Sequence, residues 1–354
     1  MTTFYYFRDD YSEGCHPNIL QALQETNLEQ QIGYSNDRYS AEAKTLINEQ
    51  LIGQHADIHF VSGGTQANLI VISAVLKPYE AVISAHTGHI NLHEAGAIEA
   101  TGHRVEAIDT SDGKLDVASI TPLLNQVNNV NSVQPKMVYI SNTTEMGTIY
   151  NKAELTALSD FCRANGLYLF LDGARLPSAL TAIGNDLTLN DIAELTDIFY
   201  IGGTKNGGLL GEAIVIIHPE LKKGFKFSIK QKGALLAKGR ILGLQFRELF
   251  RANLIFELAA YANDRALEMV PAIENQGYSF MIPPCSNQLF PILPNPIIDE
   301  LAKNYLFHTW QKIDGQHAAI RLVTSWATPA TACDRFIADL KRLTVKYKNE
   351  ATFH

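Results

Sequence analysis

Short, nearly continuous apolar runs alternate with longer amphipathic segments through the first two thirds of the chain. The runs predict strands at residues 57–61, 81–85, 105–108, 137–140, 167–171, 198–201 and 213–217. The segments between them predict helices at residues 65–76, 89–101, 117–127, 152–165 and 189–195. Strands without polar alternation are typical of a parallel sheet that is covered on both faces. The order of elements therefore predicts an α/β fold with a doubly wound, mostly parallel sheet.

The pattern changes in the last third of the chain. Residues 239–276 predict a long helical stretch rich in leucine, alanine and phenylalanine, and a proline-rich segment follows. A strand at residues 318–323 and a closing helix at residues 330–343 complete the pattern. We therefore expect a large α/β domain at residues 51–276 and a smaller C-terminal α+β domain at residues 277–354. The N-terminal segment, residues 1–50, is expected to contribute to both.

Composition narrows the class of protein. The chain has 354 residues, is 46% hydrophobic and 19% charged, and carries a net charge of -8. Without a long basic run, this balance argues against non-specific nucleic-acid binding. No apolar run reaches the roughly 20 residues of a membrane helix, and residues 1–14 lack the features of a signal peptide. These features predict a protein that binds neither nucleic acid nor membrane.

The four cysteines are far apart in the sequence, at Cys15, Cys162, Cys285 and Cys333. None lies in a CxxC pair, so the spacing indicates neither a zinc cluster nor a disulfide framework. Reduced cysteines of this kind are typical of a cytoplasmic protein. We therefore expect this chain to be cytoplasmic.

A glycine-rich turn, Ser62-Gly63-Gly64-Thr65, separates the first predicted strand from the helix that follows it. Glycines let the backbone approach an anion, and a helix N-terminus offers free N–H groups with a partial positive charge. The turn is therefore a candidate phosphate site. The alternative is an ordinary strand-to-helix turn with a capping residue.

Two strand ends carry residues suited to one kind of chemistry. Asp172-Gly173-Ala174-Arg175 follows the strand at 167–171, and Thr204-Lys205 follows the strand at 198–201. A lysine can form a Schiff base with pyridoxal phosphate, and an aspartate can keep the pyridine nitrogen protonated. An acid at the carboxyl end of a parallel strand lies where ligands bind in such sheets. The alternatives are a helix cap for Asp172 and a solvated loop lysine for Lys205.

A group of histidines, His86, His89 and His93, lies next to Glu94. A metal site is one interpretation, but the HxxxH spacing lacks the HExxH order and a third ligand, so we expect no metal. Stacking of a histidine ring on a planar cofactor is a second interpretation. An ordinary structural histidine is the third.

Arg321 interrupts the apolar run at residues 318–323. An arginine that faces inward needs a partner. That partner is either the carboxylate of a substrate or a side chain of the protein itself.

Taken in order, these motifs resemble the L-threonine aldolase group of fold-type-I pyridoxal phosphate enzymes, within the threonine aldolase/β-eliminating lyase family. The resemblance extends from about Arg8 to Leu343. Each motif alone is common, but their order and spacing together are specific. The motifs that carry it are Ser62–Asn68, Gly88-His89-Ile90 with Glu94–Ala97, Asp172–Arg175, Thr204-Lys205 and Ile320–Thr324.

The resemblance implies an aspartate aminotransferase-like large domain with pyridoxal 5′-phosphate as the cofactor. Gly64 and Thr65 would bind the phosphate and His89 would stack on the pyridine ring. Asp172 would pair with the pyridine nitrogen. Lys205 would form the Schiff base, with Thr204 beside it in the cofactor site.

The substrate site is implied in the same way. Arg175 and Arg321 would hold the carboxylate of an amino acid, and the stretch that contains Arg8 and Asp10 would contact the substrate. Lys238 would reach the phosphate in a neighbouring subunit. The active site would therefore be shared within a homodimer or a homotetramer, and symmetric assemblies are common in any case.

The implied reaction is cleavage of L-threonine or L-allo-threonine to glycine and acetaldehyde, with His89 or a water that it holds as the base. Family members often carry a histidine in an Asn-Thr-His stretch, where this chain has Thr144. That histidine is associated with the substrate hydroxyl, so the physiological substrate and its stereochemistry stay open. A β-eliminating lyase or a related transferase with the same cofactor is one alternative, and a non-catalytic protein is another.

Overall fold

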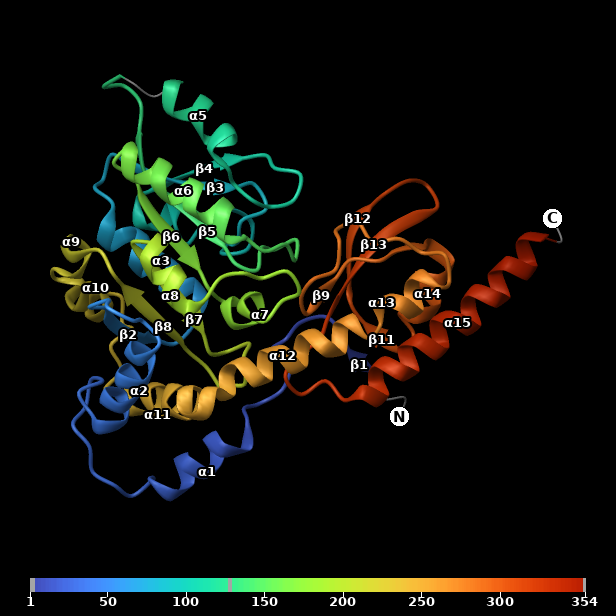
Figure 1. Ribbon diagram of the computed structural model, residues 1–354, viewed down its shortest axis with the longest axis horizontal. Helices are drawn as coiled ribbons and strands as arrows, with labels where there is room; N and C mark the ends of the chain where they lie inside the picture. The colour runs from blue at the N-terminus through green and yellow to red at the C-terminus, as the bar shows by residue number, and fades with distance from the viewer. Residues whose placement is uncertain (1–3, 127–128, 353–354) are drawn as a thin grey trace.

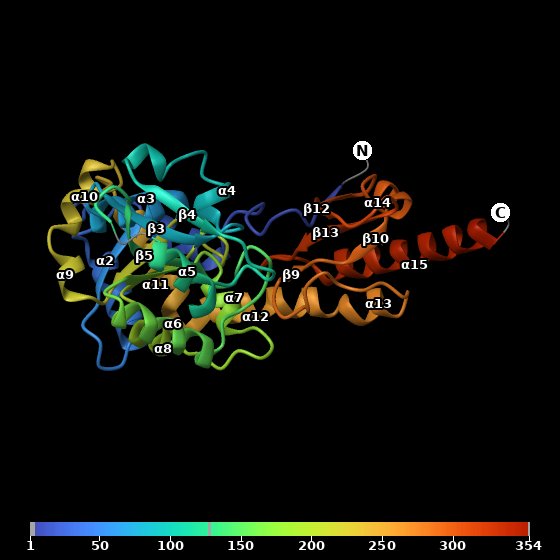
Figure 2. The same cartoon turned by 90° about the horizontal axis from the view of Figure 1, so that it is seen from above.

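The computed structural model describes residues 4–126 and 129–352. Figures 1 and 2 show two lobes joined by a long helix, with the sheet in the larger lobe. The seven strands of this sheet lie in the order β2-β8-β7-β6-β5-β3-β4. They are β2 (Asp57–Val61), β3 (Glu80–Ala85), β4 (Arg104–Ile108), β5 (Gln134–Ser141), β6 (Tyr168–Asp172), β7 (Ile198–Gly202) and β8 (Glu212–Ile216).

Only β8 runs against its neighbours, because β2–β8 and β7–β8 are antiparallel and every other pair in this sheet is parallel. The strand prediction is therefore confirmed, and so is the mostly parallel α/β class. The carboxyl ends of β5, β6 and β7 meet at one edge of the sheet. Ligands bind at this edge in open α/β sheets.

Helices cover both faces of the sheet, as the apolar strands predicted. One face packs against α3 (Gly64–Val75), α4 (His89–Leu92), α9 (Pro219–Lys222) and α10 (Phe225–Gln231). The other packs against α1 (Pro17–Glu25), α2 (Arg38–Glu49), α5 (Val117–Gln126), α6 (Lys152–Ala164), α8 (Leu189–Leu195) and α11 (Arg240–Phe250). The short α7 (Leu176–Leu180) lies beside the site. Asn151 and Glu154 form a capping box that sets where α6 begins.

Two helix predictions are wrong, for the same physical reason. The helix expected at residues 89–101 is reduced to α4 and a 3₁₀ turn at Glu99–Thr101, because Ala95 and Gly96 adopt φ values of 51° and 74°. The stretch at 239–276 divides into α11, a 3₁₀ turn at Arg251–Asn253, α12 (Leu254–Leu267) and α13 (Val270–Glu274). Its break falls at Ala252 and Asn253, which are also left-handed. Left-handed residues end a right-handed helix. Val127, the last residue of the predicted helix at 117–127, lies outside the described residues.

The smaller lobe combines short strands with helices. A four-stranded sheet holds β9 (Gln288–Leu289), β10 (Ile292–Pro294), β12 (His308–Lys312) and β13 (His317–Val323). Beside it lie α14 (Asn295–Leu301) and α15 (Ala330–Thr352), and β1 (Tyr5–Tyr6) pairs in parallel with β11 (Tyr305–Leu306). Met269 and Ile273 belong to the core of this lobe, although the sequence assigned them to the large domain. The division at residue 276 stays a prediction.

The N-terminal segment connects the two lobes. From β1 in the smaller lobe it passes the sheet edge at Asp10 and continues into α1 and α2, which pack on α11. The segment therefore brings residues from the start of the chain to the edge where the strands end.

Candidate active site

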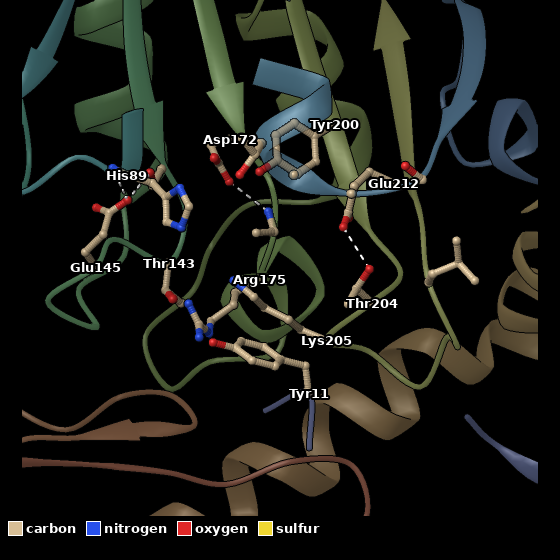
Figure 3. A pocket seen from close by; sticks show the side chains of 17 residues that line it. Tyr11, His89, Thr143, Glu145, Asp172, Arg175, Tyr200, Thr204, Lys205 and Glu212 are labelled. Carbon is tan, nitrogen blue, oxygen red and sulfur yellow. Dashed lines mark hydrogen bonds between the residues drawn. The ribbon is translucent and has the colours of Figure 1, made fainter. Parts of the chain in front are cut away.

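A cavity of about 320 Å³ lies at the carboxyl edge of the sheet (Figure 3). This volume falls in the range of small-molecule sites. Seven residues selected from the sequence line it together: Gly64, Thr65, His89, Asp172, Arg175, Thr204 and Lys205. They come from four separate segments of the chain, and the fold alone brings them together.

Asp172, the last residue of β6, is buried at the floor of the cavity. Tyr139 donates a hydrogen bond to its Oδ2 at 2.5 Å, and the backbone N–H of Ala174 donates to its Oδ1 at 3.0 Å. Burial acts to raise the pKa of Asp172, but His89 and hydrogen bonds from Tyr139 and Tyr200 outweigh it. The pKa therefore lies below its usual value, and the carboxylate stays ionised.

His89, the first residue of α4, is fixed by two carboxylates. Its Nδ1 lies 2.9 Å from Oε1 of Glu94, and its backbone N–H donates to Oε1 of Glu145 at 2.9 Å. Glu94 also accepts a hydrogen bond from Asn68, whose Nδ2 lies 3.2 Å from Oδ2 of Asp172. A carboxylate at Nδ1 places the ring proton there and leaves Nε2 as the acceptor. The ring and Asp172 are therefore held by one connected network.

Lys205 follows β7 and reaches into the cavity from the side opposite His89 (Figure 3). Burial and the charge of Arg175 lower its pKa, against the opposing effects of Asp10, Asp172 and Glu212. A lowered pKa increases the share of neutral amine, which is the nucleophilic form. Lys205 is therefore suited to attack an aldehyde.

The glycine turn lies where α3 begins. Gly63 is the N-cap of α3 and supplies no side-chain cap, so the first N–H groups of this helix remain open toward the cavity. A Cβ atom at Gly64 would lie only 3.1 Å from the hydroxyl of Tyr200. The glycine therefore lets the start of α3 pack closely against Tyr200, at an end of a helix that attracts anions.

Arg175 is held by an ion pair from the start of the chain. Its Nε and Nη2 donate to the two carboxylate oxygens of Asp10 at 2.7 and 2.9 Å. Asn287 of the smaller lobe donates to Asp10 at 3.0 Å. Asp10 lies behind Arg175 and does not line the cavity. Its geometry is that of a residue that orients the guanidinium, whereas the sequence suggested a direct substrate contact.

Arg321 lies near the same place but is less completely paired. Its Nη2 donates to the backbone oxygen of Arg8 at 3.2 Å, and its buried Nε has no partner in the described part of the chain. Burial and the charge of Arg175 lower the pKa of Arg321 to about 10. Arg175 lines the cavity, whereas Arg321 is not among the residues that line it. The side chain of Arg8 is exposed and contacts His308.

Thr144 does not face the cavity. It is fully buried, and its hydroxyl lies 2.7 Å from that of Thr148. The neighbouring residues Thr143 and Glu145 line the cavity instead. Burial and the charge of Asp172 raise the pKa of Glu145. The chain therefore presents a carboxyl group to the cavity at the position next to Thr144.

Lys238 lies on an exposed turn before α11 and outside the cavity of its own chain.

The described ranges contain no group of three or more histidine, cysteine or carboxylate side chains that could hold a metal ion. None of the helices described combines the length and apolar character needed to cross a membrane.

Sequence reasoning missed several residues of the site. Tyr139 and Tyr200 lie in apolar strands and looked like core residues, yet Tyr139 bonds to Asp172 and Tyr200 lines the cavity. Glu212 could have been noticed, since a glutamate that begins an apolar strand is unusual. The others are Tyr11, Asn68, Thr143 and Glu145. No local pattern marks these, because distant parts of the chain bring them to the cavity.

Comparison with solved structures first shows which fold the chain shares with known proteins. The fold matches that of aspartate aminotransferase from Thermus thermophilus with a TM-score of 0.71, over 96% of this chain and 92% of the other, at 13% identity. At this identity the match shows that the two chains share a fold.

The beta-eliminating lyase family matches residues 7–312, and the chain belongs to it. The chain is 30% identical to the low specificity L-threonine aldolase of Pseudomonas aeruginosa, over 94% of this chain and 96% of the relative. A solved structure of Leishmania major threonine aldolase is 50% identical, with a TM-score of 0.94, over 96% of this chain and 99% of the other. The family resemblance in the sequence is confirmed.

The residues present fit the cofactor that the family implies. A buried ionised carboxylate, an amine with a lowered pKa and an open helix N-terminus line one cavity. These are the groups that a pyridine nitrogen, an aldehyde and a phosphate need. Pyridoxal 5′-phosphate is therefore the cofactor of this enzyme.

Proposed function

We propose that this protein cleaves L-threonine or L-allo-threonine to glycine and acetaldehyde. The convergence of Asp172, His89 and Lys205 in one cavity, next to Arg175, carries the proposal. The relatives named threonine aldolase, one of them 50% identical, support the same reaction. The bound cofactor supplies an electron sink for the pair released when the Cα–Cβ bond breaks.

The side chains of the protein would divide the remaining work. Lys205 would hold the cofactor, and the ionised Asp172 would stabilise a protonated pyridine nitrogen. Gly64, Thr65 and Thr204 line the cavity at the end proposed for the phosphate. Neighbouring Arg175 and Arg321 would bind the substrate carboxylate, which would also satisfy the unpaired Nε of Arg321.

The proton of the substrate hydroxyl needs an acceptor. The hydrogen bond that Nδ1 of His89 donates to Glu94 would leave Nε2 of His89 as that acceptor, directly or through a water that it holds. Once the hydroxyl proton has moved to the base, breaking the Cα–Cβ bond would leave the aldehyde, and a proton delivered to Cα would complete glycine. The cavity would hold the substrate next to the base that takes up its hydroxyl proton.

A test combines a spectrum with a product assay. Protein loaded with pyridoxal phosphate should show a visible absorption band that is absent in Lys205→Ala and retained in Lys312→Ala, a control at an exposed lysine. The loaded protein should release acetaldehyde from L-threonine or L-allo-threonine. Ammonia and a keto acid without aldehyde, from these substrates or from L-serine, would instead establish the alternative, a β-eliminating lyase. A protein that never acquires the band would contradict the cofactor assignment.

Assembly and location belong to the same proposal. The exposed position of Lys238 is compatible with a contact to a neighbouring active site in a homodimer or homotetramer. Light scattering of the purified protein, with and without Lys238→Ala, tests this, and a monomer with full activity would contradict it. The four cysteines are all unpaired, which supports a reducing, cytoplasmic location.

A further inference from the structure

Glu212 occupies a corner of the cavity for which the proposed reaction has no use. It is the first residue of β8, opposite Val61 of β2 and Gly202 of β7. The segments that follow these two partners are the glycine turn at residues 62–65 and the turn that carries Lys205. Glu212 therefore lies between the proposed phosphate site and the proposed Schiff-base lysine, and it lines the same cavity as both (Figure 3).

The carboxyl group of Glu212 is buried but not isolated. Thr204 donates its hydroxyl to Oε1 at 3.0 Å, and the backbone N–H of Gly203 donates to Oε2 at 3.2 Å. The residue is 4% exposed. Each carboxyl oxygen has two acceptor positions, so both oxygens can still bind another partner.

The charges around Glu212 are few. Burial raises its pKa to about 8, the hydrogen bond from Thr204 and the charge of Lys205 oppose this, and the charge of Asp172 adds to it. Tyr200 of β7 is the other titratable group that interacts with it. The glycine turn after β2 presents only uncharged residues, and α11 brings Gln245 to the same turn, where it binds the N–H groups of Leu209 and Leu210.

A phosphate at the N-terminus of α3 would bring close to two negative charges into this corner. An ionised carboxylate beside it would repel the phosphate, whereas a neutral carboxylic acid has an O–H group to donate. We propose that Glu212 binds the phosphate group of the cofactor as a neutral carboxylic acid that donates its proton to a phosphate oxygen. This inference rests on the proposed cofactor site and assigns a residue to its phosphate end.

One consequence is a pH dependence of binding. Below about pH 8 the acid is already neutral, so binding needs no additional proton. Above that pH Glu212 must take up one proton from water when the phosphate binds. The affinity for a phosphate ligand should therefore fall by up to about tenfold per pH unit.

The probe must avoid the chemistry of Lys205. Pyridoxine 5′-phosphate has an alcohol in place of the aldehyde, so it forms no Schiff base, and pyridoxine lacks the phosphate as well. Titration calorimetry of both compounds into cofactor-free protein, from about pH 6.5 to about pH 9.5, brackets the pKa of Glu212. Repeating the titrations in buffers with different ionisation enthalpies counts the protons taken up.

The expected result is loss of affinity for pyridoxine 5′-phosphate above about pH 8, with uptake of close to one proton and no such slope for pyridoxine. Glu212→Gln, which is always neutral and still has a donor, should keep the affinity and lose the slope. Glu145→Gln is the matched control, because it removes another buried carboxyl group of the same cavity with a raised pKa, and it should keep the slope.

Other outcomes distinguish a failure of the role proposed for Glu212 from a failure of the cofactor site itself. A wild-type affinity that does not change with pH, or a slope that persists in Glu212→Gln, would overturn the role of Glu212 while leaving the cofactor site intact. Failure of both ligands to bind at every pH, together with no band after loading with pyridoxal phosphate, would overturn the cofactor site itself. The proton count on the wild-type protein needs no variant, so the test holds even if Glu212→Gln does not fold.

Discussion

The two sides of the cavity are built in different ways. On the sheet side, Asp172 ends β6 and Lys205 follows β7, and Tyr139 of the neighbouring β5 donates a hydrogen bond to Asp172. On the opposite side, Arg175 depends on Asp10, which is 165 positions away in the sequence. Arg321 contacts Arg8 across 313 positions and keeps an unpaired buried Nε.

This difference indicates separate roles for the two sides. On the sheet side, hydrogen bonds from Tyr139 and Asn68 hold Asp172 in place, as expected for a group that must hold a cofactor in a fixed orientation. The other side places two guanidinium groups close together and leaves a donor free, so it gains most when a carboxylate arrives. Changes on the sheet side should therefore reduce turnover, whereas changes on the other side should weaken substrate binding.

The largest effect is expected for Asp172→Asn. The substitution keeps the shape and removes the charge proposed to pair with the pyridine nitrogen, so kcat should fall on the order of 10²- to 10³-fold. Steady-state kinetics at saturating cofactor measure this. Tyr139→Phe is the control, since it removes one hydrogen bond to Asp172 and keeps the charge, and should lose only about tenfold. Equal losses in both would contradict the role of the charge.

Asp10→Asn should act on the opposite side and mainly through substrate binding. Arg175 would lose its charged partner and its fixed orientation, so kcat/KM should fall by about 10- to 100-fold, mostly through KM. Asp9→Asn is the matched control, because Asp9 bonds only locally to Tyr11 and Ser12 among the described contacts. A loss confined to kcat would contradict a positioning role.

The ion pair also sets a stability dependence on pH. Burial acts to raise the pKa of Asp10, but Arg175 and Lys205 hold it below its usual value. The stabilisation is therefore complete above the pKa of an unfolded aspartate, about 3.9, and is lost as the pH falls through the lower folded value. The difference in Tm between the wild-type protein and Asp10→Asn should narrow below about pH 4. A difference that grows in acid would contradict this.

Arg321→Gln should have a smaller effect on substrate binding, and the direction of its effect on Tm is informative. The KM for the amino acid should rise roughly tenfold, because one charge-assisted contact to the carboxylate is lost. The Tm of the ligand-free protein should stay the same or rise, since a buried, incompletely paired charge near Arg175 is removed. A lower Tm together with an unchanged KM would show that Arg321 is only structural.

The smallest effect on activity is expected for Thr144→Ala. The hydroxyl bonds to Thr148 and lies outside the cavity, so kcat/KM should change by less than about threefold while stability falls by about 1 kcal/mol. Parallel kinetics and chemical unfolding measure both quantities. A large loss of activity at wild-type stability would instead restore Thr144 as a substrate contact.

The same contrast explains how much could be predicted from the sequence. Asp172 and Lys205 could be found because each follows an apolar strand, and strand ends of a parallel sheet converge on one edge. The roles of Asp10 and Glu145 could not, because the partner of Asp10 lies far along the chain, and no local pattern marks Glu145. The helix breaks at Ala95 and Ala252 were also invisible, since alanine ordinarily favours helix and only tertiary packing holds it left-handed.

Asp10 touches both lobes at once, through Arg175 on one and Asn287 on the other. A rotation of the smaller lobe that carried Asn287 along would pull on Asp10 and turn the guanidinium of Arg175. The carboxylate would then transmit the relative orientation of the lobes to Arg175, the group proposed to bind the substrate carboxylate. Closing the lobes would then change how tightly Arg175 binds the amino acid, while the sheet beside the cofactor stays in place.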